Sequence, residues 1–383
     1  MVIYFLSVDV IKNIQNIVDL LEILCNIVYH CIVKVICLNK INLNEFTIEE
    51  LEKYIEGLGE KKFHAKQIFK WIHREKIAEI DEMTDISKSL REKLKEETYI
   101  LSLKILKVQC SKKDETKKFL IKLPDNNAIE SVFMKYNHGN TICVSTEVGC
   151  RMGCKFCAST KNGMIRKLLA SEIEGQIIAV EKYTNEKISN VVYMGIGEPL
   201  DNYDNVVKSI RIINCDIGLN IGARHISLST CGLVPEIYKL ADENIQATLS
   251  ISLHEVTDEG RRKIMPIANK YSIKELLDAC NYYIRKTGRR VSFEYALLGS
   301  QNDNKETAMK LAKLLRGMLA HVNLIPVNEI KNGEFVRPKE ENIEMFMNTL
   351  NSCSIVTTVR RELGSDIDAA CGQLRQKYIE NDA

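Results

Sequence analysis

Beyond residue 140, the chain alternates short runs of apolar and β-branched residues with amphipathic segments of helical length. The apolar runs predict strands at residues 141–145, 190–194, 225–229, 247–253, 291–298 and 322–326. The segments between them predict helices around residues 170–183, 204–214, 233–243, 272–286, 305–318 and 340–351. Because strands that alternate with helices in this way pair in parallel, the pattern indicates an α/β fold with helices outside a parallel sheet.

The first 140 residues show patterns of apolar and polar positions that differ from those of the strand–helix repeats. Between residues 47 and 97 the pattern is helical and charged, and Thr47 with Glu50 forms a capping box at its start. Residues 101–135 alternate apolar and polar positions around a turn at 124–127, which is typical of a β-hairpin. A small helical module and a hairpin are therefore expected before the α/β region.

Residues 1–40 are rich in Ile, Val and Leu. Charged residues interrupt every window of membrane-spanning length, and the segment has neither a basic start nor a small-residue cleavage site. We therefore expect no membrane span and no secretory leader. Thirteen cysteines without a leader indicate the reducing cytoplasm, where thiols serve metals and catalysis more than structural disulfides.

The net charge at pH 7 is +2 over 383 residues, which neither demands nor excludes a nucleic-acid partner. One predicted helix carries a basic stripe opposite an apolar stripe. The basic stripe consists of Lys62, Lys66, Lys70 and Arg74. Such a stripe can lie along phosphates, and it can equally be the solvated face of a helix that packs on a core. This segment alone leaves both interpretations open.

The most informative residues are Cys150, Cys154 and Cys157, which have the spacing C-x3-C-x2-C. An iron–sulfur cube held by only three thiolates keeps one iron open for a substrate. A structural zinc site needs a fourth protein ligand, usually in a second knuckle, and the sequence offers no partner knuckle. Packing as small buried side chains is a third alternative, although Arg151 and Lys155 do not suit a core segment.

This spacing is the signature of radical S-adenosylmethionine (SAM) enzymes, and several longer runs resemble the adenosine methyltransferase family of RlmN and Cfr. The runs occur in the family's order and are residues 142–145, 194–200, 227–230, 252–254, 324–328 and 366–374. The resemblance covers roughly residues 42–380. It implies an α/β fold built as a partial (β/α)6 radical SAM barrel, with a small N-terminal helical domain, a β-hairpin linker and the cluster at the C-terminal mouth of the barrel.

The patterns and the resemblance together divide the chain into five segments. These are a non-family extension (1–41), a helical accessory domain that binds RNA (42–100), a β-hairpin linker (101–140), the partial barrel (141–360) and a C-terminal segment with a methyl-carrying cysteine (361–383). In barrels the C-terminal ends of the strands carry the chemistry, and the barrel motifs lie at predicted strand ends. The position of the motifs therefore agrees with the implied fold.

The cofactors implied by the resemblance are a [4Fe-4S] cluster on the three cysteines and SAM, whose amino and carboxylate groups chelate the open iron. Gly197 and Glu198 follow a predicted buried strand, where glycine admits a ligand close to the backbone and a carboxylate attracts an ammonium. In the family this element binds the SAM amino group, whereas in isolation it also suits a turn whose glutamate caps a helix. The remaining SAM contacts implied by the family pattern are Ser229, Ser252, Leu253, His254 and Asn328.

Two further cysteines and one glutamate are assigned by the resemblance to the methyl transfer. Cys371 lies in a segment with glycine and aspartates and is implied to carry a methyl group received from one SAM. After a radical derived from a second SAM has removed a hydrogen atom, the methyl carbon adds to an electron-poor carbon of adenine. Cys143 is implied to release the product by attacking the Cys371 sulfur, and Glu130 to accept the ring proton. Without the motif, Cys143 is equally compatible with burial on a strand.

The implied activity is methylation of adenosine at C2 in 23S rRNA and tRNA. Cfr-type enzymes act at C8 of the same ribosomal adenosine and share almost all of these motifs. Pro199 and Pro326 favour the C2 class, whereas Val327 departs from the aromatic residue often found there. The expected protein is a cytoplasmic monomer with 23S rRNA, tRNA and an external flavodoxin-type electron donor as partners, and no membrane. A rival from another class is a non-catalytic, zinc-dependent RNA-binding protein.

Overall fold

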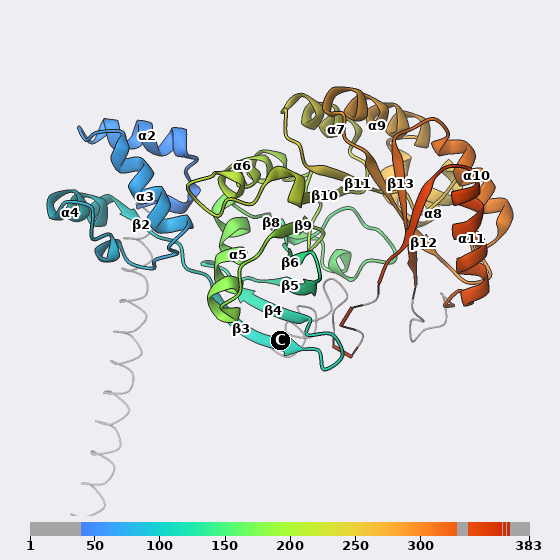
Figure 1. Ribbon diagram of the computed structural model, residues 1–383, viewed down its shortest axis with the longest axis horizontal. Helices are drawn as coiled ribbons and strands as arrows, with labels where there is room; N and C mark the ends of the chain where they lie inside the picture. The colour runs from blue at the N-terminus through green and yellow to red at the C-terminus, as the bar shows by residue number, and fades with distance from the viewer. Residues whose placement is uncertain (1–39, 328–335, 362, 365, 368–383) are drawn as a thin grey trace, which may run out of the picture.

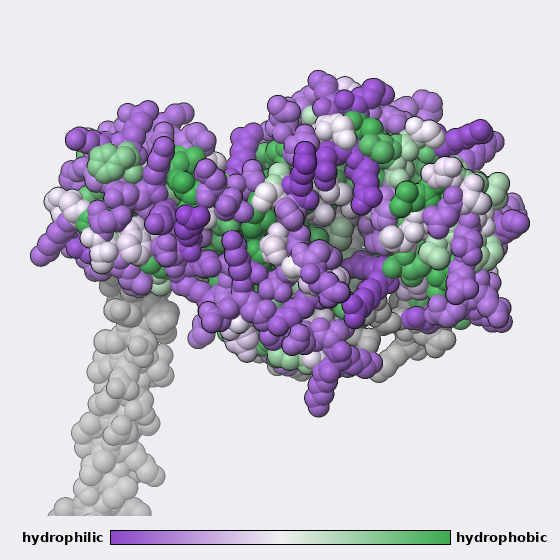
Figure 2. Space-filling model, viewed as in Figure 1, coloured by the Kyte–Doolittle hydropathy of each residue, from purple (hydrophilic) through white to green (hydrophobic). Residues whose placement is uncertain are grey.

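The computed structural model describes residues 40–327, 336–361, 363–364 and 366–367. Figure 1 shows a small helical domain beside a larger α/β domain whose sheet curves, with helices along its outer side. Figure 2 shows that the surface of both domains on this side is mostly hydrophilic. None of the helices in these residues combines the length and hydropathy needed to span a bilayer.

The helical domain has its own apolar core. Its elements are β1 (Ile41–Asn42), α2 (Ile48–Gly57), α3 (Phe63–His73), α4 (Lys88–Glu97) and β2 (Thr98–Tyr99), with β1 and β2 paired in parallel. Thr47 and Glu50 form the predicted capping box, because each side chain accepts the backbone N–H of the other. Leu51, Phe69 and Leu90 are fully buried, and each contributes roughly 1.5–3 kcal/mol of transfer free energy.

A ten-stranded sheet forms the centre of the larger domain. In chain order the strands are β3 (Lys104–Cys110), β4 (Lys117–Lys122), β5 (Ala128–Tyr136), β6 (Gly139–Cys143), β9 (Asn190–Tyr193), β10 (Ile226–Thr230), β11 (Thr248–Ser252), β12 (Val291–Leu297), β13 (Ala320–Pro326) and β14 (Val356–Val359). From β6 to β14 neighbouring strands are parallel, whereas β3 to β6 form an antiparallel meander. The hairpin region thus extends the barrel sheet, and β14 was not predicted from the sequence.

Helices connect the parallel strands and cover the outer side of the sheet (Figure 1). They are α5 (Ala170–Thr184), α6 (Tyr203–Asn214), α7 (Val234–Asp242), α8 (Asp258–Ile264), α9 (Ile273–Thr287), α10 (Lys305–Leu315) and α11 (Glu340–Ser352). Only the short α8 was missed by the periodicity. The expected α/β class, with a parallel-rich sheet that follows strand–helix repeats, is confirmed.

Alternation along the meander strands separates two faces of the sheet. Phe119, Ile129 and Ile142 pack with Ile177 of α5 in the main apolar core. Residues one position away point to the opposite face, which is the inner face of the barrel. This inner face is the one that carries the polar residues of the site.

A buried hydrogen bond joins the two domains. His73 of α3 lies 2.8 Å from a carboxylate oxygen of Glu174 of α5, and both side chains are fully buried. Ala170 and Ile212 of the barrel complete the core of the helical domain. The helical domain is therefore packed firmly onto α5 and α6.

Candidate active site

The three motif cysteines lie on one loop between the short antiparallel strands β7 (Glu147–Gly149) and β8 (Met164–Lys167). The loop is closed at its base because Cys150 N–H donates to the Gly163 carbonyl at 3.0 Å. Gly149 has φ +83°, and a Cβ there would lie 2.0 Å from that carbonyl oxygen, so the position requires glycine. Farther along, Cys157 N–H donates to the Cys154 carbonyl at 3.1 Å, which folds the second half of the motif tightly.

Burial governs the chemistry of these thiols. It raises the pKa of Cys154 to about 12 and raises that of Cys150 as well, and the nearby Cys157 sulfur adds to both shifts. Such thiols stay protonated until a cation replaces the proton. Among the described residues, no three His, Cys, Asp or Glu side chains are placed to hold a single metal ion. A cube takes each thiolate on a different iron, so three thiols on one loop fit its donor set.

Gly197 lies in the turn that follows β9, against the start of β7. Its φ is +110°, and a Cβ would stand 2.7 Å from the Thr146 hydroxyl and 2.7 Å from Glu147 Cβ. No other residue type can occupy this position without displacing the strand that leads to the cluster loop. The backbone can therefore approach a ligand closely here.

Glu198 is 4% exposed, and burial raises its pKa. Its carboxylate accepts the backbone N–H of Cys231 at 2.8 Å and that of Leu200 at 3.0 Å. Two backbone donors orient the group but leave lone pairs available. A carboxylate held in this way, beside the cluster loop, is suited to receive an ammonium group.

A second carboxylate lies beside Glu198. Glu147 accepts the backbone N–H of Glu198 at 3.0 Å, and burial raises its pKa to about 8, with nearby Asp201 and Glu198 adding to the shift. Its other oxygen is buried and has no hydrogen-bond partner among the described residues. Asp201 itself is neutralised by Arg151, whose Nε donates to it at 2.6 Å. The unpartnered acidic oxygen fits a cationic ligand such as SAM, and the sequence reasoning did not single out Glu147.

The strand-end residues expected to contact SAM lie together at the C-terminal ends of β10 and β11. Ser229 is in register with Ser250, and Ser252 with Glu294 of β12. His254 follows with φ +59°, and its Nδ1 accepts the Ala296 N–H at 3.1 Å.

Burial lowers the pKa of His254 to about 3, and nearby Arg261 lowers it further, so the ring is neutral with its proton on Nε2. The ring of Phe156, from the cluster loop, meets the His254 ring edge to face at 4.9 Å. Leu253 is fully buried. The cluster loop and the C-terminal ends of β10 and β11 therefore lie together at one end of the barrel. We call this end the mouth.

A buried arginine holds this mouth together. Arg261 of α8 is fully buried and donates to the carbonyls of Cys231, Ser252 and Leu253 at 2.5, 3.2 and 3.3 Å. It thereby fixes the ends of two neighbouring strands on which the predicted SAM contacts lie. No sequence signal identified it, because its partners are backbone carbonyls 8 to 30 positions away.

Cys143 and Glu130 lie on neighbouring strands of the meander, β6 and β5. Burial raises the pKa of Cys143 to about 11, while the positive charges of Arg360 and Lys118 oppose the shift. Glu130 is 3% exposed, and one of its oxygens lies 2.9 Å from the Lys118 ammonium. The two predicted catalytic groups thus belong to one electrostatic environment inside the barrel.

Asn328 and Cys371 lie outside the described residues. The described part of the C-terminal segment is anchored on the β3–β4 loop, where the Asp366 carboxylate accepts the Ser111 hydroxyl at 2.6 Å and the Lys112 N–H at 2.8 Å. Reciprocally, Asp114 of that loop accepts the Gly364 N–H at 2.7 Å. This anchor lies at the edge of the meander that carries Glu130.

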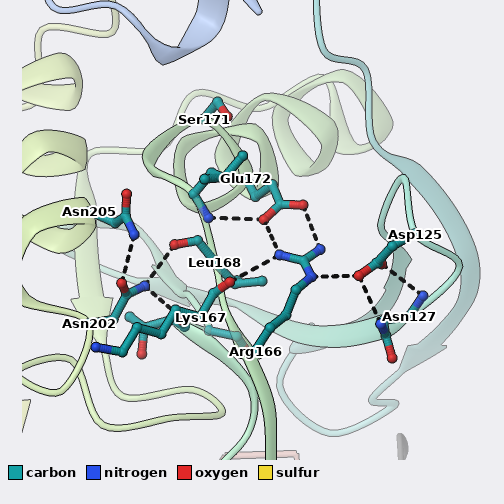
Figure 3. Close-up of polar contacts among 12 residues, drawn as sticks. Asp125, Asn127, Arg166, Lys167, Leu168, Ser171, Glu172, Asn202 and Asn205 are labelled. Carbon is teal, nitrogen blue, oxygen red and sulfur yellow. Dashed lines mark hydrogen bonds and ion pairs between the residues drawn. The ribbon is translucent and has the colours of Figure 1, made fainter. Parts of the chain in front are cut away.

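Figure 3 shows how the cluster loop is tied to the meander and to α5. Arg166 of β8 donates to both oxygens of Glu172 at 2.7 and 2.8 Å, and its Nε donates to Asp125 in the β4–β5 turn at 2.5 Å. Although burial opposes the change, the hydrogen bonds from Arg166 and Asn127 lower the pKa of Asp125 to about 2. Nearby, the Asn202 amide donates to the carbonyl of Leu168 at 2.7 Å (Figure 3).

These features define a radical SAM methyltransferase, and comparisons with known proteins agree. Residues 144–312 match the Radical SAM superfamily, and residues 41–100 match the ribosomal RNA large subunit methyltransferase N-terminal domain. A radical SAM methyltransferase from Sphaerobacter thermophilus aligns with a TM-score of 0.81 and 40% identity over 87% of this chain and 98% of its own.

Two sequence relatives are named probable dual-specificity RNA methyltransferase RlmN. The one from Clostridium perfringens (strain SM101) is 57% identical over 89% of this chain and 98% of its own length. The one from Alkaliphilus oremlandii is 53% identical over 90% of this chain and 100% of its own. The chain therefore belongs to the RlmN family, whose cofactors are a [4Fe-4S] cluster and SAM. The non-catalytic zinc protein is excluded as an alternative by this membership.

Proposed function

We propose that this enzyme methylates adenine at C2 in 23S rRNA and in tRNA, at adenosines 2503 and 37 respectively. The observation that carries the proposal is the placement of a buried carboxylate, Glu130, and a thiol, Cys143, on adjoining strands inside the barrel that bears the cluster loop. Addition of a carbon to an aromatic ring carbon needs a base to remove the ring proton, and release of a sulfur-bound product needs a second thiol. Both groups are present.

When bound at Cys150, Cys154, Cys157 and the mouth, the cluster and SAM supply a methyl group and a 5′-deoxyadenosyl radical. The acidic pair Glu147 and Glu198 would hold the ammonium of SAM. Ser229, Ser252, Leu253, His254 and Asn328 would contact the rest of the molecule. The neutral His254 ring would add no positive charge to a mouth that holds a cationic ligand.

Cys371 would carry the methyl group as a thioether. After loss of one hydrogen atom, its methylene carbon adds to C2 of adenine, because the amidine carbon is electron-poor. Glu130 would take the C2 proton while one electron passes from the adduct to a one-electron acceptor, a role that the cluster left oxidised by SAM cleavage would supply, so that the ring regains aromaticity. The product of this stage is a thioether that links Cys371 to the RNA.

Cys143 would then attack the Cys371 sulfur as a thiolate. A disulfide forms, the carbon–sulfur bond breaks, and the released electron pair takes up a proton to complete the methyl group. Two electrons from an external reductant restore the thiols, and a one-electron donor of the flavodoxin type serves the cluster. Because thiolate attack is needed, the positive charges of Arg360 and Lys118 near Cys143 favour this step.

The choice of C2 over C8 rests on two prolines. Pro199 follows Glu198 in the turn after β9, and Pro326 ends β13. The family resemblance associates these prolines with the C2 class, and Val327 is the residue that departs from it.

The helical accessory domain at 42–100 would contribute RNA binding. The basic stripe, Lys62, Lys66, Lys70 and Arg74, is exposed throughout, and within the described part of the chain only Lys62 and Lys70 make surface ion pairs, with Glu56 and Glu75. Exposed ion pairs of this kind are worth at most about 1 kcal/mol, so phosphates can displace them. The enzyme would act in the cytoplasm as a monomer.

Mass spectrometry of RNA from a deletion strain complemented with this gene tests the proposal. The expected product is C2-methyladenosine in 23S rRNA and in tRNA. A methyl group at C8 would instead assign the chain to Cfr-type chemistry, and unmodified adenosine at both positions would refute the proposal. The Cys371→Ala variant serves as the matched inactive control, because it retains the cluster ligands.

A further inference from the structure

The inner face of the meander contains a lysine to which the proposed reaction assigns no proton or group transfer. Lys118 of β4 is fully buried, which is rare for lysine unless the ammonium is paired. Its Nζ lies 2.9 Å from a carboxylate oxygen of Glu130, which is itself 3% exposed. An ion pair so far from solvent is costly to assemble, and removing one partner leaves an uncompensated charge.

The strand register places this pair in line with Cys143. Lys118 of β4 is opposite Val132 of β5, and Val132 is opposite Cys143 of β6. Residues directly opposite in a sheet share a face, and so do residues two positions apart on one strand. Glu130 is two positions from Val132, so Lys118, Glu130 and Cys143 all lie on the inner face. We call these three residues the inner row.

A buried carboxylate needs a nearby cation or hydrogen-bond donors to offset its loss of hydration. A carboxylate removed from water favours its protonated form, and a protonated carboxyl group cannot accept the adenine proton. The ammonium of Lys118 stabilises the ionised form across 2.9 Å. The same charge acts on Cys143, where it opposes the effect of burial on the thiol.

We propose that Lys118 is a positioning residue: its ammonium pairs with the Glu130 carboxylate and holds it on the inner row as the base for the adenine C2 proton. This inference rests on the proposed function. The other charged or titratable groups near the row include Arg360 and Arg361, which follow β14, Asp114 of the β3–β4 loop, and Tyr136 at the end of β5. Lys118 acts through Glu130 and does not contact the reacting atoms.

The test uses full-length enzyme loaded with cluster, SAM and an RNA stem-loop whose target adenosine carries either hydrogen or deuterium at C2. Lys118→Met removes the charge at similar volume, and Lys118→Arg retains it. Lys117→Met is the matched control, because Lys117 is the adjacent residue on the opposite face, where its ammonium lies 5.6 Å from the Phe133 ring centroid. Methylation of Cys371, 5′-deoxyadenosine and methylated RNA are measured separately between pH 6 and pH 9.

In Lys118→Met, we expect Cys371 methylation within about twofold of the wild type, and RNA methylation at pH 7 lower by about 100-fold, the scale of general-base catalysis. Because the buried carboxylate takes up a proton more readily, the acidic limb of the pH profile should move to higher pH. The deuterium effect should increase, because proton removal becomes slow. Lys118→Arg should keep most of the activity, and Lys117→Met should behave as the wild type.

A Lys118→Met enzyme with the pH profile and deuterium effect of the wild type would overturn the inference. If Lys118→Met does not fold, the neutral pair Lys118→Met with Glu130→Gln replaces it and is compared with Glu130→Gln alone. Equal RNA methylation in these two variants supports action through Glu130, whereas a further tenfold loss overturns it. Failure of the wild type itself to methylate C2 would refute the proposed function and not the role of Lys118 in holding Glu130.

Discussion

The cluster loop at 149–163 and the inner row on the meander are both built around thiols, but they are assembled differently. In the loop, Cys150, Cys154 and Cys157 are close in sequence, and two positive-φ glycines, Gly149 and Gly163, lie at the base. In the inner row, Lys118, Glu130 and Cys143 come from three strands and meet only through antiparallel register. Short spacing therefore identifies the cofactor site, whereas the acid–base site depends on long-range pairing.

The two regions also differ in what offsets the cost of ionising their buried thiols. Burial raises the pKa of Cys150, Cys154 and Cys143 alike. The loop thiols are suited to exchange protons for iron, which supplies a large positive charge. Cys143 has only the protein's own cations nearby, Arg360 and Lys118. The acid–base chemistry proposed for the inner row would therefore depend on charges that the fold itself provides.

The largest effect is expected from removing one of the three thiols of the cluster loop. Replacing Cys150, Cys154 or Cys157 by Ala removes one of three thiolates, so iron content should fall from about four per chain to near zero and SAM cleavage should be lost. Cys353→Ala, an exposed thiol just after α11, is the control and should retain both. Normal 5′-deoxyadenosine production by any of the three loop variants would contradict the cluster assignment.

The next largest effect is expected from removing the thiol of the inner row. Cys143→Ala can still charge Cys371 and attack adenine, but it cannot release the product, so a covalent protein–RNA adduct should accumulate on denaturing gels. Cys371→Ala should form no adduct. Cys110→Ala, on the exposed edge strand β3, should turn over as the wild type does. Free turnover of Cys143→Ala without adduct would rule out the two-cysteine mechanism.

The site beside the cluster loop can also be perturbed without replacing any of the three cysteines that would bind the cluster. Gly197→Ala forces a Cβ to within 2.7 Å of the Thr146 hydroxyl at φ +110°, so we expect a loss of about 1–3 kcal/mol in stability and weaker SAM binding. Gly57→Ala is the control, because a Cβ there meets no atom within 4 Å. Denaturant titration and calorimetric SAM binding measure both effects. Unchanged SAM affinity would show that the turn at Gly197 is not part of the site.

The charge balance of the inner row predicts a pH dependence. Because the pKa of Cys143 is raised to about 11, its thiolate is scarce at neutral pH and increases as pH rises toward 11. Alkylation of Cys143 in the Cys371→Ala variant should therefore accelerate about tenfold per unit from pH 7 to 10, whereas an ordinary thiol levels off near pH 9. Peptide mass spectrometry follows the modified residue. A plateau below pH 9 would contradict the raised pKa.

The smallest effect is expected at the N-terminus. Deleting residues 1–39 removes a segment without ligand chemistry and outside both family matches, so cluster content and RNA methylation should stay within about twofold. The enzyme's iron content and turnover provide the measurement. A loss beyond tenfold in folded protein would give this segment a role in one of the two regions.

Most strands and helices of the barrel could be predicted from the sequence, because the periodicity of a strand or helix is a local pattern. The periodicity predicted all parallel strands of the ten-stranded sheet except β14, whose four residues are mostly exposed at the sheet edge and lack an apolar run. It missed β7, β8 and α8, which are short and border the cluster loop. Elements this short carry too few residues for a period to appear.

The sequence by itself determined the cofactor, the family and the cysteines of the cluster, because these depend on spacing within a few residues. Only the tertiary structure decided that Glu147 joins Glu198, that Arg261 fixes two strand ends and that Lys118 pairs with Glu130. Each of these contacts depends on which strands are neighbours, in which register, and on the burial that follows. Burial in turn sets the cost of a charge and thereby the protonation of the groups at this site.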